Sequence, residues 1–170
     1  MIFKIYKFKA DFAKREQVVT PQQIAKRVVV DRLTWIEQMV AEIRALPLQD
    51  RDQFFGDSRN VWTAESCLRR ALEAALDLGR HILAKGFGIG VTEYKETAVR
   101  LEEVGVLASD TAVLLRLMAG YRNRLVHFYH DIQPEELYDI CQNHLNDLET
   151  IAEGYRAWLN EHPERLDEGL

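Results

Sequence analysis

Apolar residues recur every three or four positions along most of this chain, and this periodicity restricts the fold more than any other feature. A helix with apolar residues at this spacing has one side to bury, so each such stretch predicts an amphipathic helix. Joined by short loops, four long helices and one shorter one predict an all-α, up-and-down bundle of four to five helices. The expected helices are residues 20–46, 58–85, 92–104 and 134–161, and a helix that runs from residue 109 into the stretch at residues 120–130.

Helix start and stop signals set the expected ends of the first helix. Thr20 can cap it, Pro21 suits its first position, and Gln23 stands three residues after the cap. Pro47 cannot continue the helix, since it lacks a backbone donor. Residues 48–56 are therefore expected to form a charged connector.

Similar signals mark the later helices. Residues 86–90 contain three glycines and break the chain. A phosphate-binding glycine loop would need a preceding strand and a following lysine, which are missing, so a plain connection is favoured. Gly105 can supply a left-handed helix stop. The caps expected for these helices are Asp57 or Ser58, then Thr92, then Ser109.

The N-terminal residues differ from the rest of the chain. Residues 1–19 interleave lysine with apolar residues and lack the continuous apolar core of a secretory signal. We interpret them as an extension, either an edge strand or a basic arm, before one helical domain at residues 20–165. Cys67 and Cys141 show no CxxC and no disulfide-framework spacing, so a reducing cytoplasm is the expected location.

The net charge of −5 limits how this chain could bind nucleic acid. A protein that coats nucleic acid is usually basic over its whole surface. Binding of RNA would therefore have to rely on a local patch of positive charge. This balance argues against general high-affinity RNA binding and leaves a nuclease possible.

Residues 120–130 bring together more reactive side chains than any other stretch. They contain two arginines, an asparagine, two histidines and two tyrosines, directly after an apolar helical run. On a helix, the asparagine and both histidines share one face, and an arginine and a tyrosine share the neighbouring stripe. The side chains that this spacing allows to converge on one ligand are Arg122, Asn123, His127 and Tyr129.

These residue types suit phosphodiester cleavage in RNA. His127 can take a proton from a 2′-hydroxyl group at neutral pH. Arg122 offers a planar cationic fork to phosphate oxygens. Neither a metal nor a cofactor is needed for this chemistry. A purely structural interpretation carries equal weight at this point, because cations near a helix C-terminus are favoured by the macrodipole.

Other groupings give weaker hypotheses. His127, His130 and Asp131, with His81, do not follow a recognised zinc spacing. Glu73 and Asp77 lie one turn apart and form either an acid pair or, more commonly, a salt-bridged helical face. Cys67 is expected in the core. The three tryptophans are expected to be core side chains or dimer contacts rather than platforms for base stacking: Trp35, Trp62 and Trp158.

The segment R-N-R-L-V-H-F-Y at residues 122–129 resembles the R-x4-H-x-Y signature of the HEPN superfamily, specifically the HepT-like toxin ribonucleases. Residues 118–123 and 130–132 around it are similar to that family, as are residues 71–83 and 94–97. The resemblance covers about residues 30–155 and leaves out the N-terminal extension.

The resemblance implies a homodimeric helical bundle that cleaves RNA without a metal. It implies Arg122 and His127 as the catalytic pair, with Asn123 as polar support. It also implies a partner, a minimal nucleotidyltransferase (MNT) antitoxin, which would transfer AMP to Tyr129 and block the phosphate site by bulk and charge. The side chains left as possible RNA contacts are Arg124 and His130.

Two further hypotheses remain open from the sequence. The chain could be a non-catalytic nucleotide-binding or scaffold subunit that partners a nucleotidyltransferase, in which Arg122 and His127 hold a nucleotide. It could also be a structural dimer of helices, in which a change at His127 alters stability alone. The intact motif favours the ribonuclease, whereas the net charge of −5 favours the binding subunit.

Overall fold

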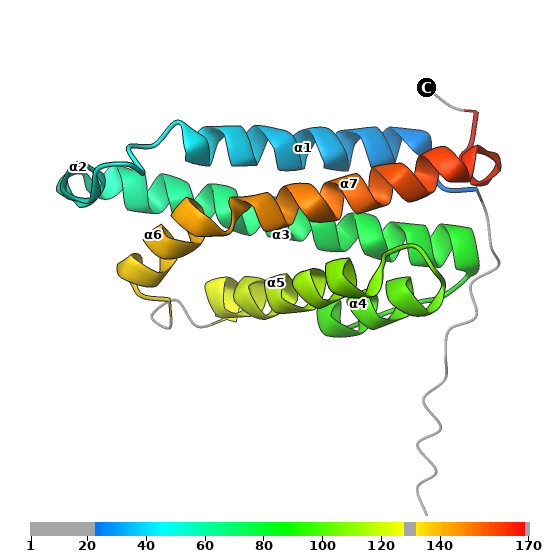
Figure 1. The fold of residues 1–170 in the computed structure, drawn as a ribbon. Helices are drawn as coiled ribbons and strands as arrows, with labels where there is room; N and C mark the ends of the chain where they lie inside the picture. Colours follow the sequence, from blue (N-terminus) through cyan, green and yellow to red (C-terminus); the bar gives the residue numbers. More distant parts are fainter. Residues whose placement is uncertain (1–22, 128–131, 169–170) are drawn as a thin grey trace, which may run out of the picture.

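The computed structural model describes residues 23–127 and 132–168, which form an all-α fold (Figure 1). Within this part of the chain there are seven α-helices and one short 3-10 helix, η1. The elements are α1 (Lys26–Arg44), α2 (Arg51–Gly56), α3 (Ser58–Phe87), α4 (Tyr94–Glu103), α5 (Ser109–His127), α6 (Pro134–Asn143), α7 (Leu145–Glu161) and η1 (Pro163–Arg165).

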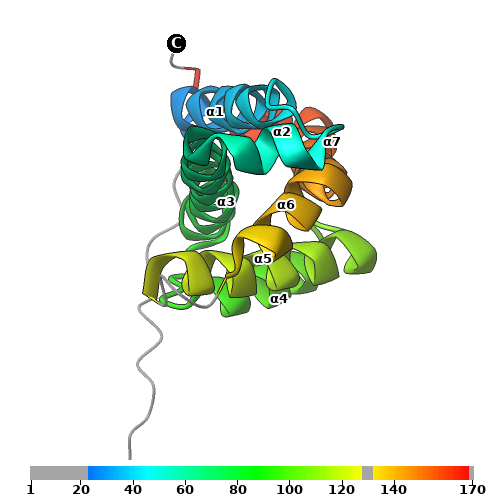
Figure 2. The same cartoon turned by 90° about the vertical axis from the view of Figure 1, so that its left-hand side faces the viewer.

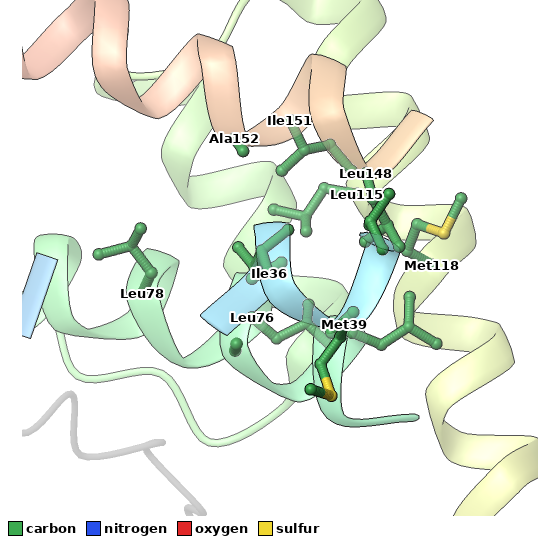
Figure 3. Close-up of a cluster of buried hydrophobic side chains, with 14 of the residues drawn as sticks. Ile36, Met39, Leu76, Leu78, Leu115, Met118, Leu148, Ile151 and Ala152 are labelled. Carbon is green, nitrogen blue, oxygen red and sulfur yellow. The ribbon is translucent and has the colours of Figure 1, made fainter. Parts of the chain in front are cut away.

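Helix α3 is the longest element and packs against all six other α-helices. Figures 1 and 2 show α1 and α7 on one side of it and α4 and α5 on the other. Twelve of its thirty residues are buried, so α3 supplies a large part of the core. Figure 3 shows a part of this core where four helices meet; its labelled residues are Ile36, Met39, Leu76, Leu78, Leu115, Met118, Leu148, Ile151 and Ala152.

The expected ends of α3 and the expected stop of α4 are confirmed. The carboxylate of Asp57 accepts a hydrogen bond of 3.0 Å from the amide of Arg59, which caps the start of α3. Gly88 follows the last turn with φ 69°, in the left-handed conformation that favours glycine. Gly105 takes φ 74° after α4. The expected cap at Thr92 is wrong, because the extended Glu93 precedes α4 without a side-chain cap.

The first helix begins later than the sequence indicates. It starts at Lys26, so the prediction of a start near residue 20 is wrong, and residue 20 itself lies outside the described residues. The first amides of α1 are satisfied by distant residues: Lys26 donates to Asp167 at 2.8 Å, and Ala25 donates to Nε2 of His81 at 3.1 Å. Tertiary contacts therefore provide the cap that local sequence does not.

The connector expected at residues 48–56 contains helix α2. Asp50 caps it by accepting a 3.0 Å hydrogen bond from the amide of Gln53. Phe54 is fully buried, and its ring centroid lies 4.9 Å from that of Tyr138 on α6. Burial of this aromatic pair stabilises a helix too short to form alone.

The helix expected at residues 134–161 is two helices, α6 and α7, which meet at His144. The apolar spacing continues through this point and gives no sign of a break. The break follows from two different packing partners. On α6 the Tyr138 hydroxyl donates to the carbonyl of Leu48 at 2.6 Å, whereas α7 packs along α1 and α5. The expected count of four to five helices is therefore too low.

A close helix crossing depends on Gly79 in α3. A Cβ atom there would lie 2.6 Å from the hydroxyl oxygen of Tyr155 and 2.8 Å from Cδ1 of Leu101. Tyr155 is fully buried and donates to the carbonyl of Ala75 at 3.2 Å. Glycine at this position therefore allows α3 to approach α7 and α4 together.

No helix among residues 23–127 and 132–168 combines the length and the apolar character that a membrane span requires.

We predict that Gly79→Ala lowers the free energy of unfolding by about 1–3 kcal/mol, because the added methyl group overpacks the Tyr155 contact. Gly120→Ala is the matched control, since nothing lies within 4 Å of its Cβ position. This second change is expected to stabilise the helix by about 0.5–1 kcal/mol. Urea unfolding of both variants checks the prediction, and equal stability of the two would contradict it.

Candidate active site

The second half of α5 carries the arginines and the asparagine of the motif. Met118, Ala119 and Leu125 are buried in the core, which sets the rotation of this part of the helix. Residues 122–124 between them are partly exposed. The helix thus holds the motif at the edge of the core, where α5 packs against α3 and α4.

Arg122 lies in a contact between three helices. Its Nη2 donates to Oε1 of Glu73 on α3 at 3.2 Å, and its guanidinium carbon lies 4.7 Å from the ring centroid of Tyr94, the first residue of α4. The Arg122 side chain is only 16% exposed. An arginine held by a carboxylate and an aromatic ring has few free rotamers and presents its fork in a defined direction.

Glu73 connects Arg122 to further charged side chains on α3. Its other carboxylate oxygen, Oε2, lies 3.5 Å from Nη1 of Arg69. The guanidinium of Arg80 lies 5.3 Å from the ring centroid of Tyr94, whose hydroxyl donates to Asp77 at 3.5 Å. These residues and Arg122 form a connected group that we call the arginine cluster: Arg69, Glu73, Asp77, Arg80, Tyr94 and Arg122.

The cluster is positive, since it contains three arginines and two carboxylates. The Nε of Arg122 is buried and has no hydrogen-bond partner among the described residues. Such a donor costs free energy unless a ligand or water satisfies it. The positive balance of the cluster and the partly exposed guanidinium of Arg122 suit an anion such as a phosphate group.

The structure describes only some of the remaining motif side chains. Asn123 is partly exposed beside Arg122. His127 is the last residue of α5, and its side chain lies outside the described part, as do Tyr129 and His130. Of the four side chains expected to converge on one ligand, the structure describes only those of Arg122 and Asn123. Their convergence with His127 and Tyr129 stays a prediction.

Arg124, expected as an RNA contact, faces α6 in this structure. Its two terminal nitrogens donate to both carboxylate oxygens of Glu136, at 2.6 and 2.8 Å. This bidentate pair links α5 to α6 across the segment that carries the end of the motif. A contact between Arg124 and RNA stays a prediction, and it would have to compete with Glu136.

Sequence reasoning did not connect Glu73 and Tyr94 to the motif. The interpretation of Glu73 and Asp77 as a salt-bridged face is confirmed for Glu73, which pairs with two arginines. The one available signal was the resemblance of residues 71–83 and 94–97 to the same family as the motif.

The alternative metal site stays a hypothesis, because the side chains of His127, His130 and Asp131 lie outside the described part of the chain. Among the described residues, no three histidine, cysteine or carboxylate side chains lie close enough together to hold a metal. His81 accepts the hydrogen bond that starts α1, and burial lowers its pKa, so it is favoured as a neutral structural group. Two surface hollows lie along α7 and at the α6–α7 junction, and Arg122 lines neither.

The cysteines and tryptophans divide into buried and exposed groups. Cys67 and Cys141 are buried as expected, and burial raises the pKa of Cys141 to about 12, which makes it a poor nucleophile. Trp158 is buried. The core interpretation is wrong for Trp35 and Trp62, which are 38% and 66% exposed. Dimer contacts at these two residues stay a prediction.

Comparison with known proteins identifies similar sequences. The profile of the family described as Ribonuclease HepT-like matches residues 36–154, which include the whole arginine cluster. A tRNA nuclease HepT from Aphanizomenon flos-aquae is 27% identical over 112 residues, 65% of this chain and 76% of that protein. An mRNA nuclease HepT from Shewanella oneidensis is 23% identical over 131 residues, 76% of this chain and 97% of that protein.

A solved structure shows the same arrangement of helices. It is a tri-AMPylated HEPN toxin from Shewanella oneidensis in complex with an MNT antitoxin. It matches with a TM-score of 0.69 and 22% identity, over 76% of this chain and 97% of that chain. The described residues therefore adopt a HEPN-like fold.

We predict a favourable coupling between Arg122 and Glu73. A double-mutant cycle with Arg122→Ala and Glu73→Ala is expected to give a coupling free energy of about 1 kcal/mol, since the pair is largely shielded from solvent. The measurement is the free energy of unfolding of the wild type, both single variants and the double variant. A control cycle pairs Arg122→Ala with Glu149→Ala, whose carboxylate instead contacts Arg44. Equal coupling in both cycles would show that the Glu73 contact contributes nothing.

Proposed function

This chain belongs to the HepT-like ribonuclease family, and on that premise we propose that it is the toxin of a toxin–antitoxin system and cleaves RNA. The observation that carries the proposal is Arg122, the motif arginine, which Glu73 and Tyr94 hold and whose buried Nε has no hydrogen-bond partner among residues 23–127 and 132–168. His127 follows at the motif spacing. The two HepT relatives, described as tRNA and mRNA nucleases, support RNA as the substrate.

The proposed reaction uses the 2′-hydroxyl of the substrate as the nucleophile. His127 removes its proton, the 2′-oxygen forms a bond to phosphorus, and the bond to the 5′-oxygen breaks. The leaving oxygen takes a proton from the imidazolium or from water. Arg122 stabilises the negative charge that builds up on the phosphate, and Asn123 supports this geometry by hydrogen bonding. The cytoplasm, where cellular RNA is present, is the proposed location.

We propose that the toxin acts as a homodimer and that the motifs of both copies face a shared cleft. Part of the motif helix has apolar side chains on its surface: Val113 and Leu117, one turn apart on α5, are 54% and 58% exposed. Apolar stripes of this kind are suited to a second helical surface. A cleft between two copies would surround an RNA strand better than one open surface.

The proposed control is transfer of AMP from an MNT antitoxin to Tyr129. The Shewanella toxin of similar fold is AMPylated and bound to such an antitoxin. Tyr129 is two residues after His127, so an attached nucleotide would add bulk and negative charge beside the catalytic pair. The phosphate of the RNA substrate would then be repelled from Arg122.

A second candidate function is a non-catalytic subunit that binds nucleotides for a nucleotidyltransferase. The net charge of −5 favours this alternative, since it disfavours binding of long polyanions. Under it, the arginine cluster would hold a single nucleotide phosphate and cut nothing.

We predict that the purified chain cleaves RNA in the presence of EDTA and that Arg122→Ala and His127→Ala each lower the rate at least 100-fold. The measurement is the initial rate on labelled RNA. Arg116→Ala is the matched control, because Arg116 is exposed on the same helix and outside the arginine cluster. Cleavage by both motif variants at the wild-type rate, or none by the unmodified protein, would contradict the proposal.

We also predict that Tyr129→Phe keeps RNase activity and removes control by the antitoxin. Phenylalanine lacks the hydroxyl that accepts AMP but preserves the ring. After incubation with ATP and the nucleotidyltransferase, wild type is expected to gain the mass of AMP and lose activity. The variant should show neither change in mass spectrometry and RNase assays. Inhibition of both proteins to the same degree would overturn Tyr129 as the control point.

A further inference from the structure

A line of side chains extends the arginine cluster along α3, beyond the residues of the motif. Residues seven apart on an α-helix return to nearly the same side, and residues four apart lie close to it. Trp62, Arg69, Glu73 and Arg80 follow this spacing. Contacts place the last three on the Arg122 side of α3: Glu73 pairs with Arg122 and Arg69, and Arg80 shares the Tyr94 ring with Arg122.

Trp62 therefore lies on the same side of α3 as the motif arginine. It is 66% exposed, the largest exposure among the exposed large hydrophobic side chains of the described residues. It stands eleven positions before Glu73, a rise of about 16 Å along the helix. The C-terminal end of α5 lies toward the α2 end of α3 (Figures 1 and 2), and Trp62 is the fifth residue of α3, near that end.

The chemistry of this line matches a flexible, single-stranded polyanion. Proteins that bind single strands combine cations along the backbone with aromatic side chains that stack on bases. Arg69 is partly exposed, at 36%, between Trp62 and Arg122. Its pairing with Glu73 holds it next to the motif arginine, and the arginine cluster is locally positive on a chain with net charge −5. A single free nucleotide would not span the distance from Arg122 to Trp62.

From this arrangement we infer a substrate subsite: Trp62 stacks on an unpaired base of the RNA strand, and Arg69 binds a phosphate between that base and the scissile bond at Arg122. The inference rests on the proposed function, since it names the path of the RNA from the same site. It also assigns a ligand to an exposed tryptophan that neither the core nor the motif explains.

The test measures binding of wild-type protein to a labelled, single-stranded 2′-O-methyl RNA, which has no free 2′-hydroxyl and stays intact. Trp62→Ala is expected to weaken binding about 5- to 150-fold, the range for loss of one stacked base. Trp62→Phe should keep most of the affinity because its ring still stacks. Val30→Ala, at an apolar side chain on α1 that is 43% exposed, is the control and should bind as wild type.

Arg69 has its own test and control. Arg69→Ala is expected to lower the slope of log affinity against log salt by about 0.7, the value for one phosphate contact on a single strand. Arg27→Ala removes a similar pair, Arg27 with Asp31 four residues on, from α1 and should leave the slope unchanged. An equal slope for wild type and Arg69→Ala would overturn the phosphate contact.

Two further results separate this inference from the proposed function. If wild type cleaves RNA and Trp62→Ala binds the 2′-O-methyl RNA as tightly as wild type, the subsite is overturned and the proposed function stands. If Trp62→Ala weakens binding but wild type does not cut unmodified RNA, the subsite is supported and the proposed nuclease activity is overturned. Sedimentation of each variant completes the test, because a loss of binding that accompanies a loss of dimer would assign Trp62 to subunit contact and overturn the inference.

Discussion

The packing of the six other α-helices against α3 is the constraint on which the rest of this structure depends. Helix α3 provides a common surface against which the other helices pack, and its small residues decide how closely they approach. Gly79 allows Tyr155 and Leu101 to meet over its backbone. Helices α4, α5 and α7 each pack against this helix, and α5 also packs directly against both α4 and α7.

The same constraint explains the chemistry of the arginine cluster. A polar side chain on a central helix must find a partner or reach solvent, since an unpaired buried charge is costly. Glu73 finds two arginines, and one of them is Arg122 on α5. The motif arginine is thereby oriented by the helix that organises the core. Helix α3 thus contributes both to the core and to the candidate active site. Substitutions in its core residues are therefore expected to affect the arginine cluster as well.

Several features could be read from the sequence because they are local. Helical spacing of apolar residues indicated the all-α class, and Asp57 and Gly105 marked helix ends by their own backbone preferences. The features that could not be read depend on distant partners. Phe54 forms part of a helix because Tyr138 covers it, and α6 separates from α7 without any interruption of the apolar pattern.

By itself, the sequence determined the helical class, the family and the spacing of Arg122 and His127, because periodicity and motif spacing are properties of consecutive residues. Only the tertiary structure decided that Glu73 and Tyr94 hold Arg122, that Arg124 pairs with Glu136, and that Trp62 is exposed on the Arg122 side of α3. The physical reason is that these contacts join residues from different helices. Their energies depend on how the helices pack around α3, which no local pattern records.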